Sequence, residues 1–151
     1  MTMKRNLSKL FSFLTLLILL PLSACGDEPF AAPMTIVVFG DSLTAGYRLP
    51  ADKAFPAQLE ARLHAEGYTG IRVINQGISG DNTRGGVARM HTATALQPDI
   101  IILELGANDI LGRSPASRAE PQLRKLIEAF EQSGALVLLT GIEVPGIFPG
   151  A

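Results

Sequence analysis

The 151-residue sequence lacks any concentration of basic charge. Its formal net charge is −1, its isoelectric point is about 6.1, and no more than two basic residues stand side by side. Proteins that bind nucleic acid depend on clustered lysine and arginine to neutralise phosphates. The composition therefore excludes nucleic acid as an expected partner.

Internal repeats and low-complexity segments are also absent. The chain contains 47% hydrophobic and 18% charged residues, the balance of a globular protein rather than of a disordered one. Its length is that of a single domain with a sizeable core.

The N-terminal residues have the layout of a secretory signal. Three basic residues, Lys4, Arg5 and Lys9, precede an apolar run over 10–22, and small residues follow it. A retained transmembrane anchor is the alternative, but the run is shorter than the roughly 20 residues that span a bilayer. We expect residues 1–24 to be a signal peptide.

Cysteine occurs only once, at position 25, directly after this signal. The sequence Leu-Ser-Ala-Cys over 22–25 resembles the lipobox of bacterial lipoproteins, which implies cleavage before Cys25 and acylation of its thiol. Gly26 then favours the outer membrane. We expect a lipid-anchored protein of the bacterial cell envelope that faces the periplasm, with a tether over 25–33. A cleaved, soluble and secreted protein is the alternative.

Strand-like and helix-like stretches alternate from Met34 onward, which predicts an α/β domain over 34–151 with a parallel sheet. The predicted helices cover about 55–66, 83–96 and a last segment in which Leu123, Leu126, Ile127 and Phe130 form one apolar face, with Pro121 near its start. The predicted strands are 35–39, 71–74, 99–105 and 135–140.

Three loops that follow predicted strands carry distinctive residues. Gly-Asp-Ser-Leu occupies 40–43, Asn-Gln-Gly-Ile-Ser-Gly-Asp-Asn-Thr occupies 75–83, and Gly-Ala-Asn-Asp occupies 106–109. Ligands bind at the carboxyl ends of the strands in open α/β sheets, so these loops are the candidates for function. By itself, the first segment is also an ordinary turn sequence.

In this order, the three blocks resemble those of the SGNH (GDSL) hydrolases, and within them the arylesterases, acyl thioesterases and lysophospholipases. The resemblance runs from Thr35 to about Thr140. It implies a flavodoxin-like three-layer α/β/α sandwich. It also implies hydrolysis of small-molecule acyl esters or thioesters, with no metal or organic cofactor.

The resemblance also implies roles for individual residues. Ser42 would be the nucleophile and would form an acyl-enzyme. The backbone amides of Ser42 and Gly80 and the side-chain amide of Asn108 would form an oxyanion hole.

Three acidic residues lie in or beside these blocks. For Asp41 and Asp109 we expect a supporting role, in which their side chains hold the loops through hydrogen bonds to backbone groups. For Glu104 we expect a structural role, although the sequence indicates no partner.

The last block of the family, Asp-x-x-His, which supplies the general base and its orienting carboxylate, is missing. Neither histidine replaces it well. His64 follows Glu60 by one turn, as on a solvated helix face, and His91 lies in the middle of a predicted helix. We therefore expect the sequence to be truncated and to lack the C-terminal strand and helix. A histidine from beyond Ala151 would then supply the general base. The alternatives are an inactive lipoprotein that acts as a binding or envelope module, and a degraded gene product.

Overall fold

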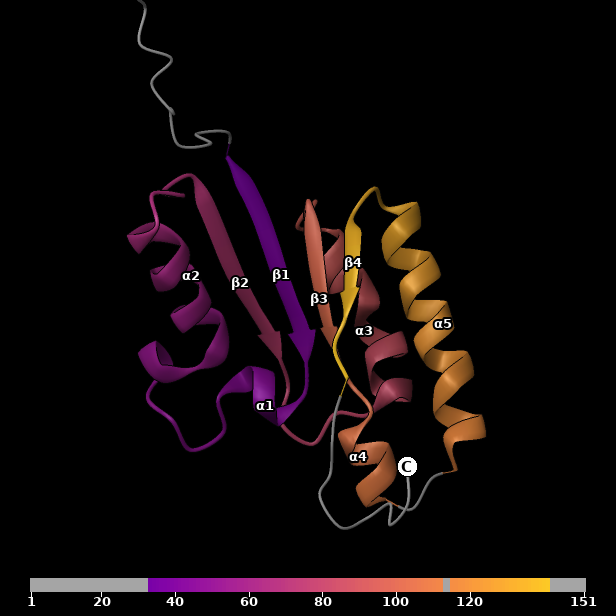
Figure 1. The fold of residues 1–151 in the computed structure, drawn as a ribbon. Helices are drawn as coiled ribbons and strands as arrows, with labels where there is room; N and C mark the ends of the chain where they lie inside the picture. Colours follow the sequence, from indigo (N-terminus) through magenta and orange to yellow (C-terminus); the bar gives the residue numbers. More distant parts are fainter. Residues whose placement is uncertain (1–32, 113–114, 142–151) are drawn as a thin grey trace, which may run out of the picture.

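A four-stranded parallel sheet organises the computed structural model, which describes residues 33–112 and 115–141 (Figure 1). The strand order is β2-β1-β3-β4. The strands are β1 (Met34–Gly40), β2 (Ile71–Gly77), β3 (Ile100–Glu104) and β4 (Leu136–Leu139). The predicted α/β class with a parallel sheet is confirmed.

Helices connect the strands. They are α1 (Ser42–Ala45), the 3-10 helix η1 (Ala51–Lys53), α2 (Phe55–Ala65), α3 (Thr83–Thr94), α4 (Ala107–Leu111) and α5 (Ala116–Gln132). The three longest were predicted from their apolar spacing. The short helices α1, η1 and α4 were not predicted. Pro121 lies inside α5 rather than at its start, because this helix begins five residues earlier.

The predicted signal peptide, Cys25 and all of the predicted tether except Pro33 fall outside the described residues. Within 33–112 and 115–141, no helix has both the length and the apolar character needed to cross a membrane.

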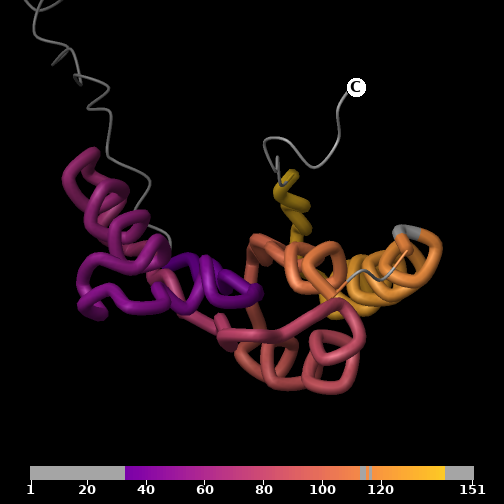
Figure 2. The backbone as a smooth tube through the Cα atoms, turned by 90° about the horizontal axis from the view of Figure 1, so that it is seen from below, coloured from indigo at the N-terminus to yellow at the C-terminus, as the bar shows by residue number. Residues whose placement is uncertain are grey.

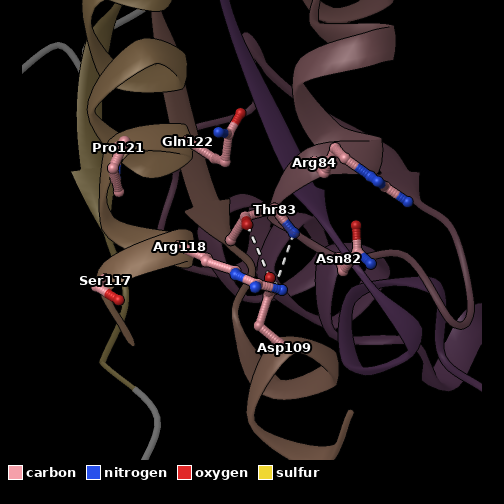
Figure 3. Close-up of a pocket in the computed structure, with 8 residues that line it drawn as sticks. All are labelled: Asn82, Thr83, Arg84, Asp109, Ser117, Arg118, Pro121 and Gln122. Carbon is pink, nitrogen blue, oxygen red and sulfur yellow. Dashed lines mark hydrogen bonds between the residues drawn. The ribbon is translucent and has the colours of Figure 1, made fainter. Parts of the chain in front are cut away.

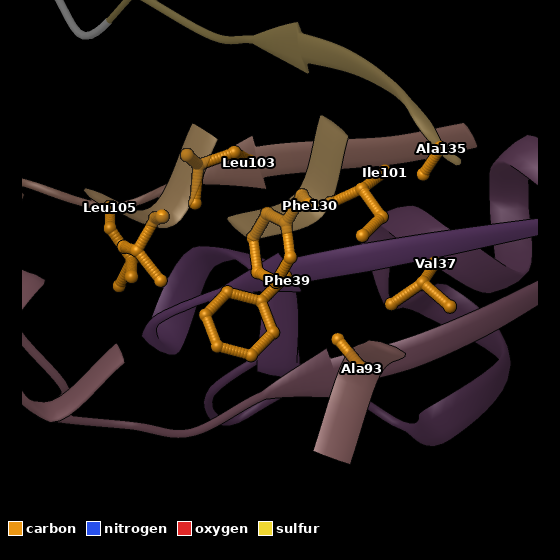
Figure 4. Close-up of a cluster of buried hydrophobic side chains, with 9 residues drawn as sticks. Val37, Phe39, Ala93, Ile101, Leu103, Leu105, Phe130 and Ala135 are labelled. Atoms are coloured by element: carbon orange, nitrogen blue, oxygen red, sulfur yellow. The ribbon is translucent and has the colours of Figure 1, made fainter. Parts of the chain in front are cut away.

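The main hydrophobic core lies between the sheet and helices α3 and α5 (Figure 4). Val37 and Phe39 of β1 point into it because alternate residues of a strand face the same side. The ring of Phe130 from α5 meets the Phe39 ring edge to face, with 5.2 Å between centroids. Such aromatic contacts add to the free energy gained from burying the rings. The core therefore joins α5, the longest helix, to strand β1.

Helix α2 protects one edge of the sheet. It packs along β2, and its side chains bond to the backbone of that strand. The Glu60 carboxylate accepts a hydrogen bond from the Val73 amide at 2.6 Å, and His64 Nε2 lies 2.7 Å from the Ile71 carbonyl oxygen. His64 is exposed and Glu60 partly so, in line with the predicted solvated helix face, but both side chains also bond to backbone groups of β2.

The opposite edge of the described sheet is formed by β4 and is open. Leu136, Leu138 and Leu139 are 60%, 47% and 52% exposed, which is unusual for three leucines on one short strand. An exposed apolar strand at an edge invites pairing with another chain.

The carboxyl edge of the sheet, where the strands end, brings three loops together. Gly40 of β1 is aligned with Gly77 of β2 on one side and with Glu104 of β3 on the other. The chain leaves these three strands at the same level, and Figure 2 views the molecule from this end. The loops that carry the sequence motifs therefore start as neighbours.

Candidate active site

The Ser42 loop is a tight turn from β1 into α1. Asp41 is fully buried and caps this helix, since its Oδ1 accepts a hydrogen bond from the Leu43 amide at 3.0 Å. Ser42 is the first helical residue and is half-buried. The turn thus holds the serine at the carboxyl edge, where a ligand has access to it.

The Gly80 loop follows β2 and is joined to β1. The Ile78 amide donates to the Gly40 carbonyl oxygen at 3.0 Å. Gly80 has φ of +85°, a conformation that side chains disfavour, and a Cβ atom built there would meet nothing within 4 Å. The backbone conformation thus favours glycine, and the space beside its Cα is open.

Asn108 joins the three loops. Its Nδ2 group donates to Asp41 Oδ2 at 3.1 Å and to the Asp81 carbonyl oxygen at 2.7 Å. Asp41 precedes Ser42 and Asp81 follows Gly80, so this one amide connects the neighbours of both other predicted oxyanion donors. Both of its hydrogens point at protein acceptors, and one must be redirected for Asn108 to bind a substrate oxygen.

Asp109 anchors α4 to the start of α3. Its carboxylate accepts hydrogen bonds from the Thr83 amide and the Thr83 hydroxyl, both at 2.9 Å. Asp109 and Thr83 are both buried, so these bonds are shielded from water. Together with the bonds of Asn108, they fix the loop after β3 to the loop after β2.

Glu104 lies beneath the Ser42 loop. Its Oε2 accepts a hydrogen bond from the Thr44 hydroxyl at 2.9 Å and lies 3.4 Å from the Asp41 amide, whereas Oε1 has no partner among the described residues. Burial raises the pKa of Glu104 above its ordinary value of 4.5. The nearby Asp41 carboxylate adds to this rise, against the lowering effect of the Thr44 hydrogen bond.

Sequence reasoning missed Arg89, which lies under the same loops. It forms an ion pair with Asp81 at 2.6 Å, and both side chains are largely shielded from solvent. Nothing in the motifs indicates it, since an arginine in a helix is usually a surface residue. Only the packing of α3 against the ends of β1 and β2 reveals its position.

A pocket of about 500 Å³ adjoins these loops between α3, α4 and α5 (Figure 3). Asp109 lines it and is joined to Thr83 by two hydrogen bonds, and Arg118 of α5 extends toward Asp109. The lining residues are Asn82, Thr83, Arg84, Asp109, Ser117, Arg118, Pro121 and Gln122.

Neither histidine lies near Ser42. His64 bonds to Ile71, the first residue of β2, and so lies toward the end of the sheet opposite to Ser42. His91 is exposed in the third turn of α3, beyond the helix start that meets the carboxyl edge. Over 33–112 and 115–141, no three His, Cys, Asp or Glu side chains are grouped as ligands of a metal ion.

Comparison with known protein families gives a match that covers most of the chain. Residues 38–151 match the model of the GDSL-like Lipase/Acylhydrolase family. An arylesterase of Vibrio mimicus is 38% identical over 135 residues, which are 85% of this chain and 64% of that protein. Esterase TesA of Pseudomonas aeruginosa is 38% identical over 116 residues, which are 76% of this chain and 57% of that protein.

Solved structures of esterases also resemble this chain. AlinE4, an esterase of the SGNH-hydrolase family, superposes with a TM-score of 0.70 at 36% identity, over 74% of this chain and 60% of that one. The crystal structure of TesA gives a TM-score of 0.70 at 37% identity, over 74% and 62%. The chain thus spans roughly three fifths of the length of the relatives that it matches.

Proposed function

The chain belongs to the GDSL-like lipase/acylhydrolase family, as its motifs predict, and from this premise we propose that the whole protein is a serine esterase acting through Ser42. One observation carries the proposal. Asn108 is hydrogen-bonded to the residues next to Ser42 and Gly80, so three separate loops form one compact group at the carboxyl edge.

In the proposed reaction, Ser42 Oγ attacks the carbonyl carbon of an ester or thioester. The carbonyl oxygen becomes an oxyanion, which the amides of Ser42 and Gly80 and the Asn108 side chain stabilise. Collapse of this intermediate expels the alcohol or thiol and leaves an acyl group on Ser42, which water then removes.

The attack also needs an acceptor for the Ser42 proton. The positions of His64 and His91 exclude both from this role in the described fold. We therefore assign the general base of the whole protein to a histidine outside residues 1–151, in agreement with the block that the resemblance implies.

The substrate class follows from the names of the relatives. They include an arylesterase, an esterase and an enzyme named thioesterase 1/protease 1/lysophospholipase L1. We propose small acyl or aryl esters and thioesters as substrates of this protein. The alternative of a non-catalytic binding module has no support from these relatives.

Rescue by added imidazole tests the proposal on the chain itself. Imidazole can act as a diffusible general base where none is positioned. Hydrolysis of p-nitrophenyl acetate should rise with imidazole concentration more steeply for the wild type than for Ser42→Ala, and intact-mass spectrometry should detect an acetyl adduct on the wild type that Ser42→Ala lacks. Equal slopes for the two proteins, without an adduct, contradict the proposal.

We also propose that Cys25 carries a lipid anchor in the bacterial envelope. The proposal rests on the lipobox-like sequence and on the position of the only cysteine. Expression in a bacterial host with a labelled fatty acid should label the wild type but not Cys25→Ser. An unlabelled wild type found in the soluble periplasmic fraction contradicts it.

A further inference from the structure

The guanidinium group of Arg89 contacts three segments of the candidate site at once. Nε donates to Asp81 Oδ2 at 2.6 Å, Nη1 to the Gln76 carbonyl oxygen at 2.9 Å and Nη2 to the Gly40 carbonyl oxygen at 2.9 Å. Gly40 and Gln76 lie at the ends of β1 and β2, and Asp81 follows Gly80. One side chain therefore joins the ends of two strands to the Gly80 loop.

The packing of α3 allows this reach. Gly86 lies one turn before Arg89 on the same face, and a Cβ atom there would overlap Leu105 Cδ1 and crowd Phe39. A glycine thus lets the helix approach β1 closely. The Arg89 guanidinium then stacks on the Phe39 ring, 3.9 Å from its centroid, which holds the guanidinium plane in place.

Arg89 is connected to the predicted oxyanion donors through two of its partners, Asp81 and Gly40. Asp81, held by the ion pair, presents its carbonyl oxygen to Asn108 Nδ2 at 2.7 Å and adjoins Gly80. Gly40, held through its carbonyl oxygen, is followed directly by Asp41 and Ser42. Both connections start from the same planar group and together reach all three predicted donors.

We propose that Arg89 is a positioning residue that sets the spacing of the Ser42, Gly80 and Asn108 donors. It does not touch the substrate; it acts through Gly40, Gln76 and Asp81. Arginine suits this role because its donors point in fixed directions, whereas a lysine ammonium acts as a point charge and cannot reproduce three directed bonds.

The test rests on the proposed function but includes one readout that does not depend on catalysis. Arg89→Gln and Arg89→Lys are compared with the wild type in imidazole-supported hydrolysis. Misplacement of a catalytic group by about 1 Å costs on the order of 100-fold. We expect kcat to fall roughly 10- to 100-fold in both variants, with KM changed less than about twofold.

Amide resonances supply the second readout. In ¹H–¹⁵N spectra, the Gly80 backbone amide and the Asn108 side-chain amide should shift or broaden in both Arg89 variants. Arg124→Gln, which breaks an exposed ion pair with Glu120 on α5, is the control and should leave kcat and both signals unchanged. Asp81→Asn, a milder change to the same ion pair, should show the same effects if the Arg89 variants do not fold.

Two outcomes are decisive. Folded Arg89 variants with wild-type kcat and unshifted Gly80 and Asn108 signals overturn the proposal, even when their melting temperatures are lower. Absence of Ser42-dependent turnover in the wild type overturns the proposed function instead, while the amide signals still decide whether Arg89 positions these donors.

Discussion

Asn108 is already fully bonded in the free protein, and this fact shapes what its removal should do. Its amide satisfies Asp41 and Asp81, so Asn108→Ala removes both a proposed oxyanion donor and a link between loops. We expect the imidazole-supported rate of Ser42-dependent hydrolysis to fall about 100- to 1,000-fold, the effect of losing one oxyanion donor. Asn75→Ala should cost less, because its amide donates to the Thr44 carbonyl oxygen at 3.0 Å, so the variant loses hydrogen bonds but no proposed oxyanion donor.

Glu104 gives the protein a predictable dependence on pH. Its pKa is raised by burial, so over the window between the ordinary value of 4.5 and the folded value, the folded protein holds a proton that the unfolded chain has released. The free energy of unfolding therefore falls as pH rises through this window and stays lower above it.

Glu104→Gln should remove this dependence, because the amide oxygen can still accept from Thr44 without ever ionising. Urea unfolding from about pH 4 to about pH 8 should show the variant gaining stability relative to the wild type as pH rises. Glu120→Gln, at an exposed ion pair, is the control for loss of a carboxylate. A constant difference between Glu104→Gln and the wild type across this range contradicts the prediction.

Whether the role of a single residue could be predicted from the sequence depends on how far along the chain its partners lie. Ser42, Gly80 and Asn108 could be predicted from sequence because the family resemblance assigns roles to three short motifs that follow predicted strands. The contacts of Glu104 with Thr44 and of Arg89 with Gly40 span 60 and 49 positions and depend on strand register and helix packing. Periodicity does not encode such distances, so these partners required the structure.

Among the elements, β2 owes its protection to two α2 side chains. Glu60→Ala should leave the Val73 amide without its charged acceptor and lower the free energy of unfolding by about 1–3 kcal/mol. Urea denaturation measures this loss. Glu66→Ala breaks only an exposed pair with Arg62 on the same helix and should change stability by less than about 0.5 kcal/mol. An equal loss of unfolding free energy in the two variants would mean that the contact between Glu60 and Val73 does not stabilise the fold.

The longer elements were predictable because burial imposes a regular pattern on them. Helix α5 shows its apolar face at i, i+3, i+4 and i+7, and β1 is a continuous apolar run. The short helices α1 and α4 have too few residues to show a period. Their formation depends on local bonds, such as the Asp41 cap, and on packing against the strand ends.

At the scale of the whole molecule, the two edges of the described sheet differ. One is covered by α2, and the other exposes the leucines of β4. Replacing Leu136 and Leu138, which lie on one face of the strand, by lysine should reduce self-association, since charge on an edge strand opposes pairing. Static light scattering against concentration measures this change. Tyr68→Lys, at an exposed site away from β4, is the control and should not reduce it.

The two ends of β1, lastly, lie at opposite ends of the molecule. The chain enters the sheet at Met34 and reaches the Ser42 turn after Gly40, about 23 Å farther on at roughly 3.3 Å per residue. Under the proposal that Cys25 is acylated, the anchored end and the catalytic end are opposite poles. The length of β1 then separates Ser42 from the point where the tether joins the domain, so the proposed nucleophile does not lie at the attachment site of the anchor.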